Sequence, residues 1–256
     1  MPYLSDLLAT TRARVDEARA KITEDALEQR VASAEPARGF ARSLRGDEVA
    51  VIAEIKRATP RAGDLALDLD AGRTASLYRD GGAAAISVLT EPEYFKGSLE
   101  DLDAARGPGL PVLRKDFILE PFQIYESRGY GADAVLLIVR TVGPELAELY
   151  TLTRALGMDA LVEVHTEEDL DRALELGPDL IGVNHRDLET FELDPDRTAK
   201  LTPRIPDGVV VVGLSGVSTR AEVLALKDAG AHAVLVGESV VTATDPVTKL
   251  KELRGA

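Results

Sequence analysis

The stretch "VVVVGLSGVSTRAEVLALKDAGAHAVLVG" (residues 209–237) contains one complete strand–helix–strand unit. It begins with a continuous apolar run of strand length and ends with a second one, "AVLVG". Between the two runs, Ser218 is the predicted N-cap of a helix that has Glu222 in its first turn, and Gly230 opens a short connector to the next strand. Continuous apolar strands joined through a helix are typical of a parallel sheet covered on both faces.

The same unit recurs along the chain. The eight predicted strands are residues 49–55, 83–89, 111–117, 134–139, 160–164, 180–184, 209–215 and 233–237. Eight units favour a closed barrel, because an open doubly wound sheet usually has fewer strands and often a glycine-rich first turn. No G-x-G-x-x-G pattern follows the first predicted strand. We therefore predict an α/β fold, a (β/α)₈ TIM barrel that forms a single domain over residues 1–256.

Residues 1–48 are predicted to form an N-terminal helical extension. Leu4, Leu7, Leu8 and Val15 give this segment a partial apolar stripe, so it packs against the barrel. Two placements of the extension on the barrel are compatible with that stripe. The extension is either a plug at the bottom of the barrel or a lid near its mouth.

The composition excludes several classes of protein. A net charge of −14 argues against nucleic acid and anionic membranes as partners, since both are bound by clustered Lys and Arg. The chain has no cysteine, which rules out disulfides, thiolate nucleophiles and Cys-ligated zinc. The N-terminal segment lacks the apolar region of a signal peptide, and no apolar run has the length of a membrane span. We expect a cytoplasmic monomer that acts on a small molecule.

Polar side chains end several predicted strands on the face that points into the barrel. Catalytic groups of this fold gather at the carboxyl ends of the strands, and a charge within an apolar strand is costly unless it is paired or used. The inward residues at these ends are Glu54 and Lys56, Lys115, Glu163, and Asn184 with Arg186 beyond it. A single such residue is most simply explained as one partner of an ion pair at the barrel rim. Four strands that deliver them to one mouth indicate acid–base chemistry.

Glycines follow the seventh and eighth predicted strands in "LSGVST" and "LVGESV". Gly216 and Gly237 let backbone N–H groups approach an anion, and the loops after strands 7 and 8 hold phosphate in many barrels. Ser215 and Glu238 belong to the same loops, and Glu238 is compatible with an anion site if the backbone makes the contacts. These loops are therefore predicted to bind a phosphate.

The three histidines, His165, His185 and His232, are scattered and lack the spacing of a metal site, so we predict no metal. His165 and His185 follow strand ends, and we expect them at the rim of the mouth.

Five segments together carry a family resemblance: "VIAEIKRATPRAG", "ISVLTEPEYFKGSLEDL", "PVLRKDFILEPFQIYESRGYGADAVLLIV", "LVEVHTEEDLDRALELG" and "IGVNHRDLETFELD". In this order they closely resemble indole-3-glycerol phosphate synthases of tryptophan biosynthesis, over residues 49–247. The resemblance implies a (β/α)₈ barrel without cofactor or metal. It also implies a carbon–carbon lyase that closes the ring of 1-(2-carboxyphenylamino)-1-deoxyribulose 5-phosphate, then decarboxylates and dehydrates it to indole-3-glycerol phosphate.

Carried over by motif, Lys115 resembles the general acid that activates the ribulose carbonyl. Lys56 and Glu163 resemble the pair that serves carboxylate binding, dehydration and proton removal, while Glu54 and Asn184 resemble groups that orient the substrate hydroxyls and both lysines. How the acid and base roles divide between the lysines stays open. The resemblance assigns the phosphate to Thr59 (usually serine in the family), Arg186, Ser215, Gly216, Gly237 and the backbone at Glu238, and the anthranilate ring to Phe95 and Phe117.

Leu214 departs from the family pattern, in which the seventh strand reads roughly V-A-E-S-G-I and carries an active-site glutamate. Here the matching run is "VGLSGV", and Leu214 lies on the inward face by parity with Val210 and Val212. Three interpretations remain: a synthase that tolerates the change, a paralogue or engineered variant that takes a more apolar substrate, or a protein that binds sugar phosphate without turnover. A rival enzyme class, the phosphoribosyl isomerases, is disfavoured because the strand ends carry lysine and glutamate.

Overall fold

The computed structural model describes residues 3–256, so residues 1–2 of the predicted extension lie outside the described part. Its centre is a closed barrel of parallel strands in the order β1-β10-β9-β8-β7-β6-β5-β4. These strands are β1 (Ala50–Ile55), β4 (Ala85–Leu89), β5 (Val112–Lys115), β6 (Ala134–Ile138), β7 (Asp159–Val164), β8 (Leu180–Asn184), β9 (Val210–Leu214) and β10 (Ala233–Val236). Each overlaps one predicted strand, so the (β/α)₈ prediction is confirmed.

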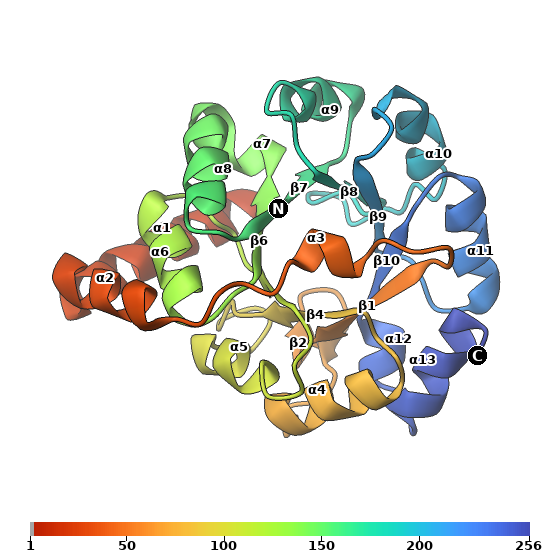
Figure 1. The fold of residues 1–256 in the computed structure, drawn as a ribbon, viewed down its shortest axis with the longest axis horizontal. Coiled ribbons are helices and arrows are strands. Elements are labelled where there is room, and N and C mark those ends of the chain that lie inside the picture. The colour runs from red at the N-terminus through yellow and green to blue at the C-terminus, as the bar shows by residue number, and fades with distance from the viewer. Residues whose placement is uncertain (1–2) are drawn as a thin grey trace.

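Helices join consecutive strands and form a ring outside the barrel (Figure 1). They are α4 (Ala71–Asp80), α5 (Leu99–Ala105), α6 (Pro121–Gly129), α7 (Val139–Val142), α8 (Leu146–Ala155), α9 (Glu167–Leu174), α10 (Arg197–Leu201), α11 (Arg220–Asp228), α12 (Glu238–Val241) and α13 (Pro246–Arg254). Two 3₁₀ turns, η1 (Gly143–Glu145) and η2 (Thr202–Arg204), lie among them. A short antiparallel hairpin of β2 (Ala58–Thr59) and β3 (Gly63–Asp64) follows β1.

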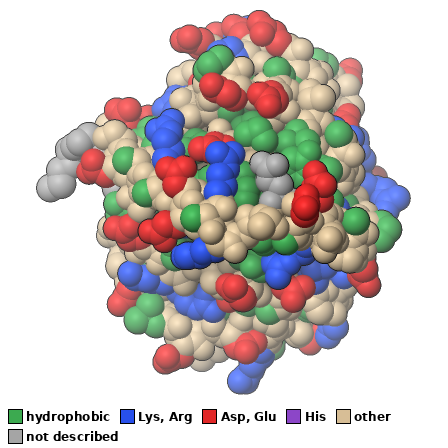
Figure 2. Space-filling model, turned by 90° about the vertical axis from the view of Figure 1, so that its left-hand side faces the viewer, with side chains coloured by type: hydrophobic (Ala, Val, Ile, Leu, Met, Phe, Trp, Pro, Cys, Tyr) green, Lys and Arg blue, Asp and Glu red, His purple; other side chains and the backbone are tan. Residues whose placement is uncertain are grey.

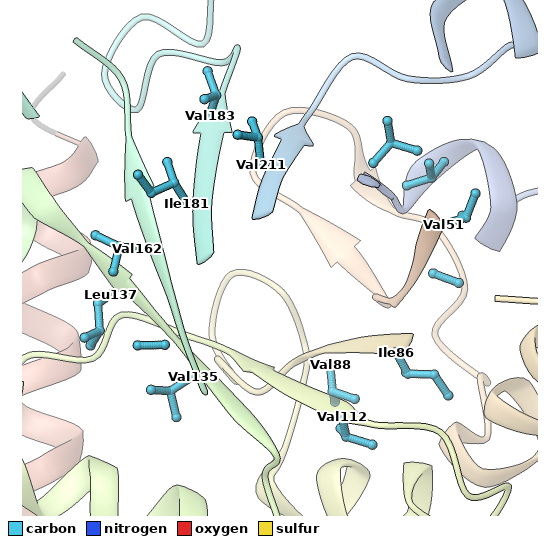
Figure 3. Close-up of a cluster of buried hydrophobic side chains, with 14 of the residues drawn as sticks. Val51, Ile86, Val88, Val112, Val135, Leu137, Val162, Ile181, Val183 and Val211 are labelled. Carbon is cyan, nitrogen blue, oxygen red and sulfur yellow. The ribbon is translucent and has the colours of Figure 1, made fainter. Parts of the chain in front are cut away.

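The strands read as continuous apolar runs because both of their faces are buried. Alternate residues such as Val135, Val162 and Val211 point outward and pack in the layer between the strands and the helices (Figure 3). The intervening residues fill the barrel interior, as Ile52 and Leu161 do at 0% exposure. A half-exposed sheet would instead alternate apolar and polar residues.

Reciprocal capping boxes begin the helices after β7 and β9. In α9, Thr166 accepts from the N–H of Asp169 while the Asp169 side chain accepts from the N–H of Thr166. In α11, the N-cap is Thr219 rather than the predicted Ser218. The prediction was one residue early, because Glu222 accepts from the N–H groups of both Ser218 and Thr219, whereas only Thr219 returns the bond to the N–H of Glu222.

The N-terminal extension covers both ends of the barrel. It contains α1 (Tyr3–Lys21), α2 (Glu24–Ser33) and α3 (Phe40–Ser43). Figure 1 shows α3 crossing the near opening, where Phe40 is fully buried against the barrel interior. The N–H of Ala41 donates to Asp159 at the start of β7, 2.8 Å away, which places α3 at the bottom.

At the other end of the barrel, α1 lies beside the carboxyl ends of the strands. Arg14 of α1 pairs with Asp116, directly after β5, at 2.8 Å, and Leu4 lines the cavity at the mouth. Both positions expected for the extension are therefore occupied, the plug by α3 and the mouth by α1.

The surface shown in Figure 2 mixes acidic and basic side chains and presents no extended basic patch on that face. Among residues 3–256, no helix combines the length and the apolar character required to cross a bilayer.

Candidate active site

A cavity of about 430 Å³ opens at the carboxyl ends of the barrel strands. Every residue that the sequence singled out for catalysis lines it: Glu54, Lys56, Lys115, Glu163 and Asn184. Every residue singled out for binding lines it as well, as does Leu214: Thr59, Phe95, Phe117, Arg186, Ser215, Gly216, Gly237 and Glu238. Strand parity placed the five catalytic candidates and Leu214 correctly, because inward and outward residues alternate along the barrel strands.

One half of the mouth, formed by Glu54, Lys56 and Lys115, is the ion-paired half. Lys56 Nζ lies 2.9 Å from Glu54 Oε1, and the Ser87 hydroxyl lies 3.4 Å from the other carboxylate oxygen. Burial alone would raise the pKa of Glu54, but the charges of Lys56 and Lys115 outweigh it and hold that pKa below its ordinary value. Glu54 is therefore a fixed negative charge that is paired with Lys56 and also stabilised by the charge of Lys115.

The opposite half, formed by Glu163, Asn184 and Ser215, is the amide half. Asn184 Nδ2 donates to Glu163 Oε1 at 3.0 Å, and Ser215 Oγ donates to Asn184 Oδ1 at 2.8 Å. The backbone N–H of Arg186 donates to the same amide oxygen at 3.0 Å. This chain of bonds fixes the rotamer of Asn184, so its amide presents N–H to Glu163 and to no cation.

Apolar side chains separate the two halves. On one side Leu214 pairs in register with Asn184 of β8 and with Leu235 of β10. Leu214 is 1% exposed, and its Cδ1 lies so close to Gly182 that a Cβ there would meet it at 2.9 Å. On the other side, Ile138 of β6 pairs in register with Glu163. The site thus has two polar halves with an aliphatic floor between them.

The loops after β9 and β10 bring backbone to one edge of the cavity. Ser215 and Gly216 have φ values of 69° and 78°, so the chain turns sharply directly after Leu214. At Gly237 a Cβ would come within 2.5 Å of Glu54 Oε1 and 2.9 Å of Lys56 Nζ. Glycine at 237 is therefore required for the loop to approach the ion-paired half.

Phe95 and Phe117 are held by the carboxylates that precede them. Glu91 accepts from the backbone N–H of Phe95 at 3.0 Å and from that of Tyr94 at 2.6 Å, which folds the loop after β4. Asp116 accepts from the N–H of Phe117 at 2.9 Å. Both rings thus line the cavity from loops with fixed backbones.

Asp116 joins β5 to two arginines. It is paired with Arg14 at 2.8 Å and with Arg114 at 3.0 Å, and it accepts from Thr90 at 2.7 Å. Burial would raise its pKa, but the two guanidinium groups lower the pKa of Asp116 to about 2. The residue after Lys115 is therefore a permanent anion that ties α1 to the end of β5.

The expectation that His165 and His185 are rim residues was wrong, because each is 3% exposed and neither lines the cavity. The His185 ring contacts the Ser215 carbonyl and the Thr198 hydroxyl at 3.1 and 2.7 Å, beneath the loop after β8. His165 Nε2 lies 3.3 Å from Glu163 Oε1. Burial, the largest influence, lowers the pKa of both histidines. Neutral imidazoles therefore support the amide half from behind.

Among residues 3–256, no group of three or more His, Cys, Asp or Glu side chains is arranged to hold a metal ion. Leu4 and Arg61 are among the cavity residues that were not anticipated. The signal for Arg61 was present in the sequence, a cation between Pro60 and Gly63 in the loop after the first strand. Leu4 was assigned to a stripe whose partner the sequence did not identify.

A family model described as "Indole-3-glycerol phosphate synthase" matches residues 4–253. A protein of that name from Mycolicibacterium vanbaalenii is 48% identical over 252 residues, covering 98% of this chain and 93% of its own. The protein of the same name from Mycobacterium tuberculosis is 45% identical with the same coverage.

Two solved structures share the fold at low identity. Thiamine phosphate pyrophosphorylase from Pyrococcus furiosus superposes with a TM-score of 0.60 at 17% identity, over 81% of this chain and 94% of that one. Orotidine 5'-phosphate decarboxylase from Pyrococcus horikoshii has a TM-score of 0.60 at 15% identity, over 80% and 100%. At these identities they show the barrel fold alone.

Proposed function

The chain belongs to the indole-3-glycerol phosphate synthase family, and from that premise we propose how its barrel mouth performs the reaction. The enzyme is a carboxy-lyase that converts 1-(2-carboxyphenylamino)-1-deoxyribulose 5-phosphate to indole-3-glycerol phosphate. The observation that carries the proposal is that Lys56, directly after β1, Lys115 of β5 and Glu163 of β7 line one cavity large enough for one small molecule.

Ring closure is the first step, and Lys115 serves it as general acid. When the aromatic carbon attacks the ribulose carbonyl, negative charge develops on the carbonyl oxygen, and a nearby ammonium group stabilises that charge and supplies a proton. Lys56 faces the substrate carboxylate. Its pairing with Glu54 at 2.9 Å holds the ammonium group at the mouth while leaving further N–H donors for the substrate.

Decarboxylation releases CO₂ and leaves the ring carbon bonded to the former carbonyl carbon. Loss of water then needs an acid at the hydroxyl and a base for the departing proton. Glu163 suits the second task because its Oε2 is buried and has no hydrogen-bond partner among residues 3–256. Asn184 holds the other oxygen, which fixes the orientation of the Glu163 carboxylate.

Binding is divided between two parts of the mouth. The phosphate is bound by Arg186, Thr59 and the backbone of the loops at Gly216 and Gly237. The aromatic ring lies between Phe95 and Phe117, above the aliphatic floor. We expect the enzyme to work as a cytoplasmic monomer without metal or cofactor.

The direct test supplies the carboxyphenylamino-deoxyribulose phosphate and follows the indole product by fluorescence. The chain contains no tryptophan, so the protein adds little background. We expect turnover that is lost in Lys115→Ala. If the protein binds the substrate but forms no indole, it is the non-catalytic sugar-phosphate binder that Leu214 suggested. The retained lysines and the relatives' identity over nearly the whole chain favour the synthase.

A further inference from the structure

Arg61 lies at the tip of the β2–β3 hairpin, on the edge of the cavity. The hairpin pairs Thr59 with Gly63, and the Thr59 hydroxyl accepts from the N–H of Ala62 at 2.9 Å. Gly63 has a φ of 70°, a conformation that favours glycine, so the turn is tight and well defined. Because the turn is fixed by these local bonds, the Arg61 side chain is directed over the mouth that it lines.

The guanidinium group of Arg61 is occupied by Glu238, the first residue of α12. Arg61 Nη2 lies 2.8 Å from one carboxylate oxygen and 3.0 Å from the other. Arg61 and Glu238 also both act on the charge of Arg186, whose pKa is lowered by burial first and by Arg61 second. One carboxylate therefore lies near two guanidinium groups, beside Gly237, at the edge of the cavity assigned above to phosphate.

We propose that Arg61 is a further phosphate-binding residue, and that the Glu238 carboxylate occupies Arg61 until the substrate phosphate displaces it. This inference rests on the proposed function, because it adds a residue to the same binding site. Carboxylate and phosphate are both anions that match the fork of an arginine, so the two compete for one partner. A bound phosphate dianion would also repel the carboxylate from that place.

The Arg61–Glu238 pair is suited to exchange because it is weakly held. The side chains of Arg61 and Glu238 are 48% and 45% exposed, and ion pairs so open to water contribute little to stability. A stronger, dianionic ligand can therefore take the guanidinium group at small cost. By contrast, the buried Glu54–Lys56 pair, with side chains 4% and 13% exposed, is not expected to exchange.

The test measures the dissociation constant of inorganic phosphate by calorimetry on the full chain, together with KM for the substrate. In Arg61→Ala we expect phosphate binding about tenfold weaker and a KM raised by a similar factor, with a smaller effect on kcat, since a charge-assisted hydrogen bond of this type is lost. In Glu238→Gln we expect phosphate binding about threefold tighter or more, because the competing charge is removed.

Arg79→Ala is the matched control. Arg79 is also an arginine half-exposed to water and paired with a carboxylate, that of Asp80 at 2.7 Å, but it lies on α4 and does not line the cavity. Its removal should leave phosphate binding unchanged. Unaltered phosphate binding in Arg61→Ala would overturn the proposal, and so would weaker binding in Glu238→Gln.

These outcomes are separate from those that test the synthase assignment. If the wild-type protein forms no indole but binds phosphate through Arg61, the assigned reaction fails while this inference stands. If it forms indole with a KM that is insensitive to Arg61, the inference alone fails.

Discussion

The two halves of the mouth treat their carboxylates in opposite ways. Glu54 is matched by Lys56 at 2.9 Å and by the charge of Lys115, and its pKa is held low. Glu163 receives one amide N–H from Asn184, and its second oxygen has no hydrogen-bond partner in the described chain. His165 Nε2 lies 3.3 Å from Glu163 Oε1, but burial lowers the pKa of that ring, so the imidazole is neutral and forms no ion pair.

This difference separates two tasks that one carboxylate performs poorly. A carboxylate locked in an ion pair positions its cation well, but it is a weak proton acceptor because protonation breaks the pair. A carboxylate held by a neutral amide keeps its orientation and has an oxygen available for the substrate. We infer that Glu54 positions the lysines of the ion-paired half and stabilises their charge, while Glu163 of the amide half takes up a proton.

The largest expected effect is a fall in kcat when the carboxylate of the amide half is removed. Glu163→Gln keeps an oxygen to which Asn184 can donate but cannot take up a proton, so kcat should fall by about 10²–10⁴. The rate of indole-3-glycerol phosphate formation in a single turnover measures this loss. Glu167→Gln, an exposed glutamate at the start of α9 that pairs with Arg204, is the control and should retain full activity. A loss below tenfold in Glu163→Gln would remove the distinction between the halves.

The next largest expected effect is on the free energy of unfolding, through Asp116 at the end of β5. Asp116→Asn leaves Arg14 and Arg114 without their shared anion, so the free energy of unfolding at pH 7 should fall by about 3 kcal/mol. Because the folded pKa of Asp116 is about 2, below its ordinary 3.8, its contribution is present above pH 4 and is lost as pH falls toward 2.

Urea unfolding from pH 7 down to pH 2.5 tests this linkage. The difference between the wild type and Asp116→Asn should narrow below pH 4. Asp80→Asn, at an exposed ion pair, should show no comparable difference at any pH. A gap between wild type and Asp116→Asn that stays constant through the acid range would contradict the assignment.

The smallest expected effect comes from a substitution at Leu214, which lies between the two halves, and it is a shift in the pH profile of kcat. Leu214→Glu introduces a carboxylate between Asn184 and Leu235, and a carboxylate favours the protonated form of ammonium groups nearby. The basic limb of the pH profile of kcat should therefore move upward by about one pH unit. Should both the profile and the rate remain those of the wild type, position 214 takes no part in the chemistry.

Much of this site could be predicted from the sequence because it depends on regular geometry. Period-two alternation along a buried strand placed Glu54 and Glu163 inside the barrel, and the same parity identified Leu214 as an inward residue. The pattern needs no knowledge of which strands are neighbours.

What could not be predicted depends on contacts between distant segments. The stripe of α1 did not show that Arg14 meets Asp116, 102 positions away, and Arg61 gave no sign of Glu238, 177 positions away. His165 and His185 were misplaced because their burial is decided by the loops that fold over them and not by the strands that precede them.

The extension that covers both barrel ends has a consequence for biosynthesis. Its anchoring partners are made long after it: Asp116 follows Arg14 by 102 residues, and Asp159 follows Ala41 by 118. At about 5–20 residues per second, the ribosome needs several seconds to supply them. The extension must therefore wait, with its apolar stripe uncovered, until synthesis has reached Asp116 for the contact of α1 and Asp159 for the contact of α3.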